Sequence, residues 1–303
     1  MAIGDVFAVE GVPDCYYVDT GMFDTPEYGA VYILDAERPA VVDAGIGTNY
    51  ELILQALEEV GIAPRELEVV ALTHVHLDHA GGAGFLHAET GADVYVHETG
   101  SKFLVDPEHI WQGTKQAVGD QIRHYEKPEP VPAPAVEPLH DGATVDLGDR
   151  ELDVYHAPGH AFHQVVFHDA PASAVYVADA AGIYVPARDA VRETSPPPGF
   201  DLEQVVADAR TIARLDPETF CYPHFGDAPA DERITEYVDV VTRWVEAVAE
   251  NRRELENDEA VVEHFVETAD VGEVWGAEKA AGEVAMNVRG VLGYLDEREE
   301  RDA

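Results

Sequence analysis

The residues with the clearest chemical potential lie in one short stretch, Thr73-His74-Val75-His76-Leu77-Asp78-His79-Ala80-Gly81-Gly82. It holds three imidazoles and a carboxylate within six positions, in the order His-x-His-x-Asp-His. Neutral imidazole and carboxylate together form a ligand set for zinc or another first-row metal. His74 and His76 alternate along an extended chain and point the same way, whereas Asp78 and His79 then turn toward a second point. The stretch predicts a metal site; a solvated polar loop that is merely rich in histidine is the simpler alternative.

Four further polar residues each follow an expected strand and lie beside Gly or Pro. A strand that ends in a loop lets a rigid scaffold aim several ligands at one point. Each residue alone is more often a turn residue, but together with the histidine stretch the four form a ligand constellation. They are Asp43, His160, Asp179 and His224.

Strands and helices are expected to alternate in the first half of the chain. The apolar run at residues 69–72 predicts a buried strand directly before the histidine stretch. The strand Ala40–Val42 ends at Asp43 before two glycines, and Thr48 is expected to cap the following helix. A helix over residues 82–89 and a strand over residues 93–97 follow. This alternation indicates an α/β layer arrangement.

The second half is also rich in strands, from residue 136 onward, which predicts two facing sheets covered on the outside by helices. Residues 99–135 break the rhythm with helical segments, over 101–105 and about 110–125, and a proline-rich connector. Such a long insertion can cap a site, or be a surface elaboration without a chemical role. From residue 231 on, apolar residues recur at helical spacing. These helices are expected to pack against the main domain; a lid or a homodimer surface is the alternative.

Acidic residues far outnumber basic ones: sixty Asp and Glu stand against nineteen Lys and Arg, a formal net charge of −41. The acid is spread along the whole chain, which argues against a disordered acidic tail. We hypothesise a halophilic protein in a cytoplasm with molar salt, where the Debye length is only about 3 Å and such a surface repels itself little. The same charge argues against nucleic acid as a partner, because phosphate binding needs basic patches.

Cys15 and Cys221 are the two cysteines, too few for a disulfide framework in a chain of 303 residues. The N-terminal residues lack the basic start and apolar core of a signal peptide. No apolar run approaches the roughly 18 residues that a membrane span needs. We therefore expect a cytoplasmic protein with no membrane partner.

On these motifs the chain resembles the metallo-β-lactamase superfamily, and within it the branch of glyoxalase II and related hydrolases. The resemblance covers roughly residues 12–228, and its five motifs occur in the family's order. It implies an α/β fold, a four-layer αβ/βα sandwich with a two-metal site at one edge of the sheets. Residues 1–228 would form the hydrolase domain, with 99–135 as its insertion, and residues 229–303 a C-terminal helical extension.

The resemblance also implies a role for each candidate ligand. Two metal ions would be held by two groups of side chains and one bridging carboxylate: His74, His76 and His160; Asp78, His79 and His224; and Asp179 as the bridge. Asp43 would orient a ligand histidine or its loop without binding metal. Two zinc ions are expected, with iron or manganese at one or both positions as alternatives.

Two cations about 3.5–4 Å apart can share a bridging hydroxide that is already deprotonated near neutral pH. The expected activity is zinc-dependent hydrolysis of a small ester or thioester, with a hydroxyacyl thioester of the glyoxalase II type as the first candidate. Asp78 or Asp179 could also accept or relay a proton. No nucleophilic Ser or Cys accompanies the ligands, which favours attack by the metal-bound hydroxide itself.

Other activities stay open on the same residues. A lactonase would use the same ligand set. A mononuclear iron oxygenase, similar to persulfide dioxygenases, would use fewer ligands and leave His224 unengaged. A phosphodiesterase or nuclease is disfavoured by the acidic surface, and a true β-lactamase by Asp179, which those enzymes typically lack. A non-catalytic binding protein is disfavoured because the full ligand set is present.

Three residues close to the candidate ligands in sequence are candidates for the wall of a substrate pocket. His163 follows His160 by three positions, Phe225 follows His224 directly, and Tyr184 comes shortly after Asp179.

Overall fold

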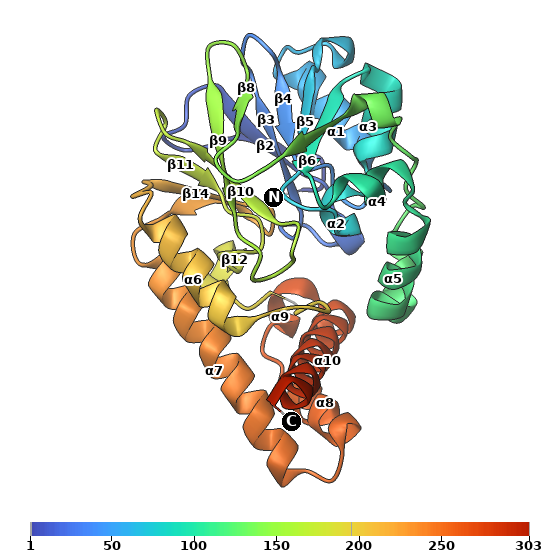
Figure 1. Ribbon diagram of the computed structural model, residues 1–303, viewed down its shortest axis with the longest axis vertical. Coiled ribbons are helices and arrows are strands. Elements are labelled where there is room, and N and C mark those ends of the chain that lie inside the picture. The colour runs from blue at the N-terminus through green and yellow to red at the C-terminus, as the bar shows by residue number, and fades with distance from the viewer. Residues whose placement is uncertain (1, 195, 303) are drawn as a thin grey trace.

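Two β-sheets lie face to face with helices on their outer sides in the computed structural model, which describes residues 2–194 and 196–302 (Figure 1). The first sheet follows chain order, and its strands pair antiparallel from β1 to β4 and parallel from β4 to β7. They are β1 (Val6–Ala8), β2 (Cys15–Asp19), β3 (Ala30–Leu34), β4 (Ala40–Val42), β5 (Val69–Ala71), β6 (Asp93–His97) and β7 (Val136–Leu139).

The second sheet has the strand order β15-β14-β11-β10-β9-β8, with β11 and β14 parallel and the other pairs antiparallel. Its strands are β8 (Thr144–Asp146), β9 (Glu151–His156), β10 (Val165–Asp169), β11 (Ala174–Tyr176), β14 (Thr219–Tyr222) and β15 (Gly226–Pro229). A separate hairpin consists of β12 (Ile183–Val185) and β13 (Ala190–Arg192).

Helices connect the strands and extend the C-terminal end. Those of the first half are α1 (Tyr50–Glu59), α2 (Leu77–Ala80), α3 (Ala83–Thr90), α4 (Ser101–Val105) and α5 (Glu108–Val118). Those of the second half are α6 (Leu202–Ala213), α7 (Arg233–Glu254), α8 (Asp258–Glu267), α9 (Gly272–Trp275) and α10 (Ala277–Asp302). Short 3-10 helices cover Met22–Asp24, Pro64–Glu66, Gly119–His124, Ala133–Ala135 and Pro186–Arg188. No helix of the described residues is both long and apolar enough to span a bilayer.

Strand β5 shows how the first sheet is buried on both faces. Val69 and Ala71 lie in the core between the sheets, whereas Val70 and Leu72 lie in the outer core with side chains of α1 and α3. Successive side chains of a strand point to opposite faces, so a strand covered on both sides requires an unbroken apolar run. The predicted buried strand is confirmed, and it leads directly into the histidine stretch.

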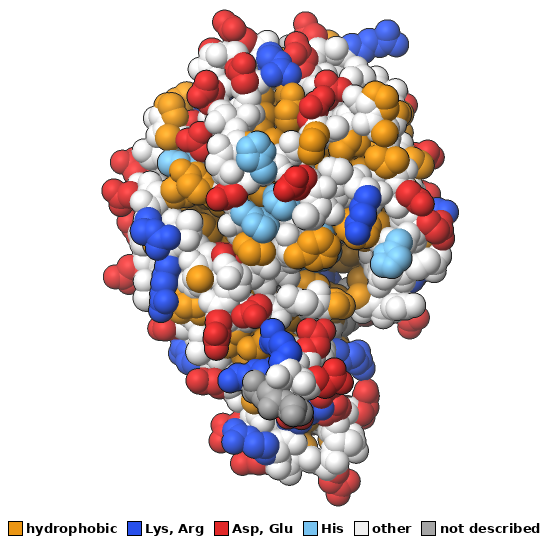
Figure 2. All heavy atoms as spheres, viewed as in Figure 1, with side chains coloured by type: hydrophobic (Ala, Val, Ile, Leu, Met, Phe, Trp, Pro, Cys, Tyr) orange, Lys and Arg blue, Asp and Glu red, His pale blue; other side chains and the backbone are white. Residues whose placement is uncertain are grey.

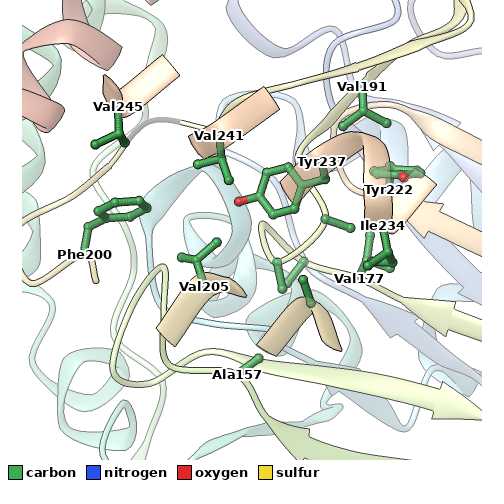
Figure 3. Close-up of a cluster of buried hydrophobic side chains, with 14 of the residues drawn as sticks. Ala157, Val177, Val191, Phe200, Val205, Tyr222, Ile234, Tyr237, Val241 and Val245 are labelled. Atoms are coloured by element: carbon green, nitrogen blue, oxygen red, sulfur yellow. The ribbon is translucent and has the colours of Figure 1, made fainter. Parts of the chain in front are cut away.

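The C-terminal helices share a core with the second sheet. Figure 3 shows Tyr237 and Val241 of α7 close to Val205 of α6 and Val177, the residue after β11. Valines of α8 and α10, among them Val261 and Val288, belong to the same core. The segment therefore packs against the main domain, and the core crosses the division expected at residue 228.

The α/β sandwich with C-terminal helices is confirmed, but several local expectations are wrong. Thr48 does not cap α1; Asn49 precedes the helix, and the Thr48 hydroxyl donates to the carbonyl of His124. The helix expected over residues 110–125 ends as an α-helix at Val118, because Gly119 takes φ 55° and ψ −125°, which glycine alone adopts readily. Residues 119–124 continue as a 3-10 helix.

Strands β12, β13 and β15 are not predicted by the sequence pattern. Strand β15 reads Gly226-Asp227-Ala228-Pro229, residue types that are depleted in strands. It lies at the edge of its sheet, where the missing N–H of a proline can face away from the neighbouring strand without loss of a hydrogen bond. Residue types therefore do not predict β15, because an edge strand tolerates residues that are rare in strands.

Candidate metal centre

The candidate ligands meet at one edge of the two sheets, each just after a strand. Asp43 follows β4, the histidine stretch follows β5, and His160, Asp179 and His224 follow β9, β11 and β14. Their ligand atoms fall into two groups, each within 4.8 Å: His74, His76, His160 and Asp179; and Asp78, His79 and His224. In Figure 2, histidine and acidic side chains gather in the middle of the face shown, with hydrophobic side chains around them.

The histidine stretch supplies both groups because the chain changes direction within it. His76 has an extended backbone, with ψ 145°, and its Nδ1 lies 3.0 Å from Nε2 of His74. The single turn of α2 then carries Asp78 and His79 to the second group. Gly82 lets this turn rest against the loop after β4, since a Cβ there would lie 2.1 Å from the carbonyl oxygen of Ala44.

Asp179 reaches histidines of both groups. Its Oδ2 lies 3.1 Å from Nε2 of His160 and 3.7 Å from Nε2 of His79. Its Oδ1 lies 3.6 Å from Nε2 of His224 and is buried without a hydrogen-bond partner among the described residues. A carboxylate in this position can join two cations.

Groups outside the two ligand sets orient the imidazoles. Asp43 accepts a hydrogen bond from Nδ1 of His79 at 2.9 Å, and the carbonyl of Tyr28 accepts one from Nδ1 of His224 at 3.0 Å. Asp43 also takes φ 64°, a left-handed backbone that non-glycine residues adopt rarely and that often marks a functional site. Both histidines therefore turn Nε2 toward the centre of the site.

This arrangement fits a divalent cation. His79 and His224 each donate their Nδ1 proton to an oxygen, so in the neutral rings both Nε2 atoms, 3.3 Å apart, present lone pairs to each other. Such a pair is stable only with positive charge beside it. Imidazole lone pairs oriented by hydrogen bonds on the opposite ring nitrogen are the usual form of a metal-binding histidine.

The pKa values of His79 and Asp179 indicate that the surroundings of the second group favour a positive charge. Burial lowers the pKa of His79, but the carboxylates of Asp78, Asp179 and Asp43 outweigh it and raise that pKa well above its ordinary value. Burial would raise the pKa of Asp179, yet His160 and His79 hold it below its usual range. The carboxylates of Asp179 and Asp78, whose pKa values both lie below the usual range, are thus ionised and attract a cation to this point.

The three histidines of the first group are neutral imidazoles. Burial is the largest cause that lowers the pKa of His74, His76 and His160, with neighbouring imidazoles adding to it, and the pKa of His76 falls to about 4. Metal binding requires unprotonated imidazole, so at neutral pH these rings are ready to bind.

The structure brings one of the three expected pocket residues to the site. The ring of His163 is buried and lies 5.4 Å from that of His76 and 6.1 Å from that of His74. Phe225 instead packs in the core between the sheets, edge-on to Tyr17 at 5.6 Å. Tyr184 stacks on Tyr222, and its hydroxyl donates to Asp189. The expectation that Phe225 forms a pocket wall is therefore wrong, whereas that for Tyr184 stays a prediction.

Sequence reasoning missed an aromatic and ionic cluster beside the second group. The ring of Tyr28 lies 5.6 Å from that of His224, and its hydroxyl donates to Glu283 at 2.7 Å. Lys279 donates to the same carboxylate at 2.5 Å and lies 3.9 Å from the centre of the Tyr28 ring. Lys279 and Glu283 are four positions apart on α10, a spacing that in sequence indicates only a helical surface pair.

A model of the metallo-beta-lactamase superfamily matches residues 24–224, a span that includes every candidate ligand. Among curated proteins, the "Acyl-coenzyme A thioesterase MBLAC2" of Gallus gallus is 32% identical over 148 residues, 44% of this chain and 50% of that protein. The human protein of the same name is 29% identical over 154 residues, 44% of this chain and 51% of that protein. The chain thus spans about half the length of these relatives.

Solved structures with the same fold cover nearly the whole chain. The archaeal metallo-beta-lactamase superfamily protein ST1585 from Sulfolobus tokodaii has a TM-score of 0.71 and 21% identity over 92% of this chain and 98% of that chain. The metallo-beta-lactamase family protein TTHA1429 from Thermus thermophilus has a TM-score of 0.64 and 19% identity over 97% of this chain and 94% of that chain. At these identities the likeness is one of fold.

Proposed function

This chain belongs to the metallo-β-lactamase superfamily, and from this premise we propose that it is a metal-dependent hydrolase of thioesters. The observation that carries the proposal is the carboxylate of Asp179, whose oxygens approach histidines of both ligand groups. The first ion would be held by the three imidazoles of the first group and the second by Asp78, His79 and His224. The donor set suits zinc, with iron or manganese as alternatives. When bound, two such ions supply an activated water at neutral pH and polarise the substrate carbonyl.

The two carboxylates among the candidate ligands, Asp78 and Asp179, differ in their access to solvent. The side chain of Asp78 is 28% exposed, whereas that of Asp179 is 6% exposed. Asp78 can therefore take up a proton at Oδ2 and release it to solvent, while Asp179 stays ionised between the ligand groups. His224 is held toward Asp78 and His79, which favours two ions over a mononuclear iron site.

Two observations favour a thioester. The relatives from chicken and human that match the chain are named acyl-coenzyme A thioesterases. A thiol has an ordinary pKa of about 8.5, so it can leave as thiolate without a dedicated acid. The net charge of −41 disfavours a phosphodiester substrate. The narrower glyoxalase II-like assignment stays a prediction.

The test combines metal analysis with a substrate panel. We expect the purified protein to hold two divalent ions per chain and to cleave a thioester faster than a lactone or an activated phosphodiester. Asp179→Ala should lose metal and thioester turnover together, whereas Asp239→Ala, on the exposed face of α7, should keep both. Preferred cleavage of the lactone or the phosphodiester, or an active Asp179→Ala variant, would contradict the proposal.

A further inference from the structure

An exposed aromatic side chain stands beside the candidate metal centre. Phe162 lies between His160 and His163 in the loop that joins β9 to β10, and it is 52% exposed. The large hydrophobic side chains exposed in the described parts of the chain are Phe162, Val105 and Ile3. A single exposed ring is ordinary, but a contiguous group of exposed apolar side chains beside a polar site indicates a binding surface.

The insertion brings a second ring to the same place. Phe103 of α4 lies 6.5 Å from Phe162 with its ring edge-on, and Val105 of the same helix is 39% exposed. Phe103 also lines a narrow apolar crevice together with Val75, Leu77, Leu104, Pro107 and Ile110. Val75 and Leu77 are buried residues of the histidine stretch, so this crevice packs the insertion against the stretch that carries the candidate ligands. Figure 2 shows hydrophobic side chains bordering the histidines on this face.

His163 joins this apolar surface to the ligand groups. Its ring lies 4.6 Å from that of Phe162 and 6.2 Å from that of Phe103. On its other side it lies 5.4 Å from the ring of His76. A substrate whose carbonyl sits at the ligand groups would therefore place its next atoms over His163 and the two phenyl rings.

We propose that Phe162 and Phe103 form an acyl platform, a surface that binds the apolar acyl chain of the substrate and sets its length. The inference rests on the proposed thioesterase function and narrows its substrate to thioesters with an aliphatic chain of several methylenes. The acyl part is the occupant because the two phenyl side chains and Val105 lack hydrogen-bonding groups, which the thiol carrier of such a substrate would need. Acyl methylenes need only contact with carbon.

The first test varies the acyl chain and the thiol carrier separately. For the metal-loaded wild type, kcat/KM should rise by roughly two- to fourfold per methylene from the butanoyl to the octanoyl thioester, the factor that burying a methylene supplies. In Phe162→Ala and Phe103→Ala this dependence should flatten, and Phe162→Leu should restore part of it. Ile3→Ala, which removes an exposed hydrophobic side chain elsewhere, should leave it unchanged. The loss of kcat/KM in these variants could instead depend on whether the thiol carrier is coenzyme A or N-acetylcysteamine, and not on acyl length. In that case the platform binds the carrier and the proposal is wrong.

A second measurement separates this inference from the proposed function. Decanamide should bind the metal-loaded wild type in a calorimetric titration, and Phe162→Ala should weaken this binding by at least about tenfold. If no thioester is cleaved but decanamide binding depends on Phe162, the function is wrong and the apolar site stands. If thioesters are cleaved at rates that neither acyl length nor Phe162 affects, the function stands and the platform is overturned.

Discussion

The carboxylate of Asp43 accepts a hydrogen bond from Nδ1 of His79 at 2.9 Å. It also accepts hydrogen bonds from the backbone N–H and the hydroxyl of Thr73, at 2.8 and 2.9 Å. That hydroxyl lies 3.1 Å from Nδ1 of His74. One carboxylate at the end of β4 thus orients a histidine of each ligand group, because β4 and β5 are parallel neighbours whose carboxyl ends meet.

Asp43→Ala should lower metal affinity without removing a ligand. Loss of such an orienting partner usually weakens metal binding by about 10- to 100-fold. Competition with a chromophoric chelator would measure the change, and Asp35→Ala, an exposed aspartate just after β3, is the matched control. Equal affinity in the two variants would show that Asp43 does not support the site.

Lys279→Met should destabilise the fold strongly. Lys279 and Glu283 form a buried ion pair, and removal of the cation leaves a carboxylate uncompensated in the interior. Breaking such a pair costs about 3–5 kcal/mol of unfolding free energy. Urea unfolding would measure this, with Lys127→Met as the control, since Lys127 pairs with Glu108 at the surface. A similar urea midpoint for both variants would argue that the buried pair contributes little.

Both cysteines should be unreactive in the folded protein. Burial raises the pKa of Cys15 to about 12, and it raises that of Cys221 well above its ordinary value. The thiolate is the reactive form, so a disulfide reagent at pH 8 should label neither residue until the chain unfolds. Between pH 9 and about 12 the unfolded chain loses the Cys15 proton while the folded chain keeps it, so this group lowers stability as the pH rises. Fast labelling of the native protein would contradict the burial of the two thiols.

The acidic surface predicts a dependence of stability on salt. At a net charge of −41, repulsion between surface carboxylates is screened in molar KCl but extends over about 10 Å at about 0.1 M salt. The midpoint of cooperative thermal unfolding should therefore be higher in molar KCl. Equal midpoints would reject the hypothesis of a high-salt cytoplasm. Sedimentation under the same conditions would test the homodimer, which stays a prediction.

The sequence determined the chemical types at the site and the order in which they occur. The candidate ligands lie in segments that follow apolar strands, and a strand end close to Gly or Pro is a local signal that needs no knowledge of distant contacts. The buried strand β5 and the histidine stretch after it can be predicted from the sequence for this reason. The orienting role of Asp43 is predicted only through the family resemblance.

The tertiary structure decided which side chains face the site. Phe225 follows His224 directly and yet packs in the opposite direction, between the sheets. Tyr28 orients His224 through its backbone carbonyl, and a backbone contact of this kind cannot be predicted from the residue type. Lys279 and Glu283 are buried only because α10 docks beside Tyr28, and Phe103 meets Phe162 only because the insertion folds back over the loop after β9. Residue type is a local property of the chain, whereas these contacts join segments far apart in sequence and arise from the packing of the two sheets and their helices.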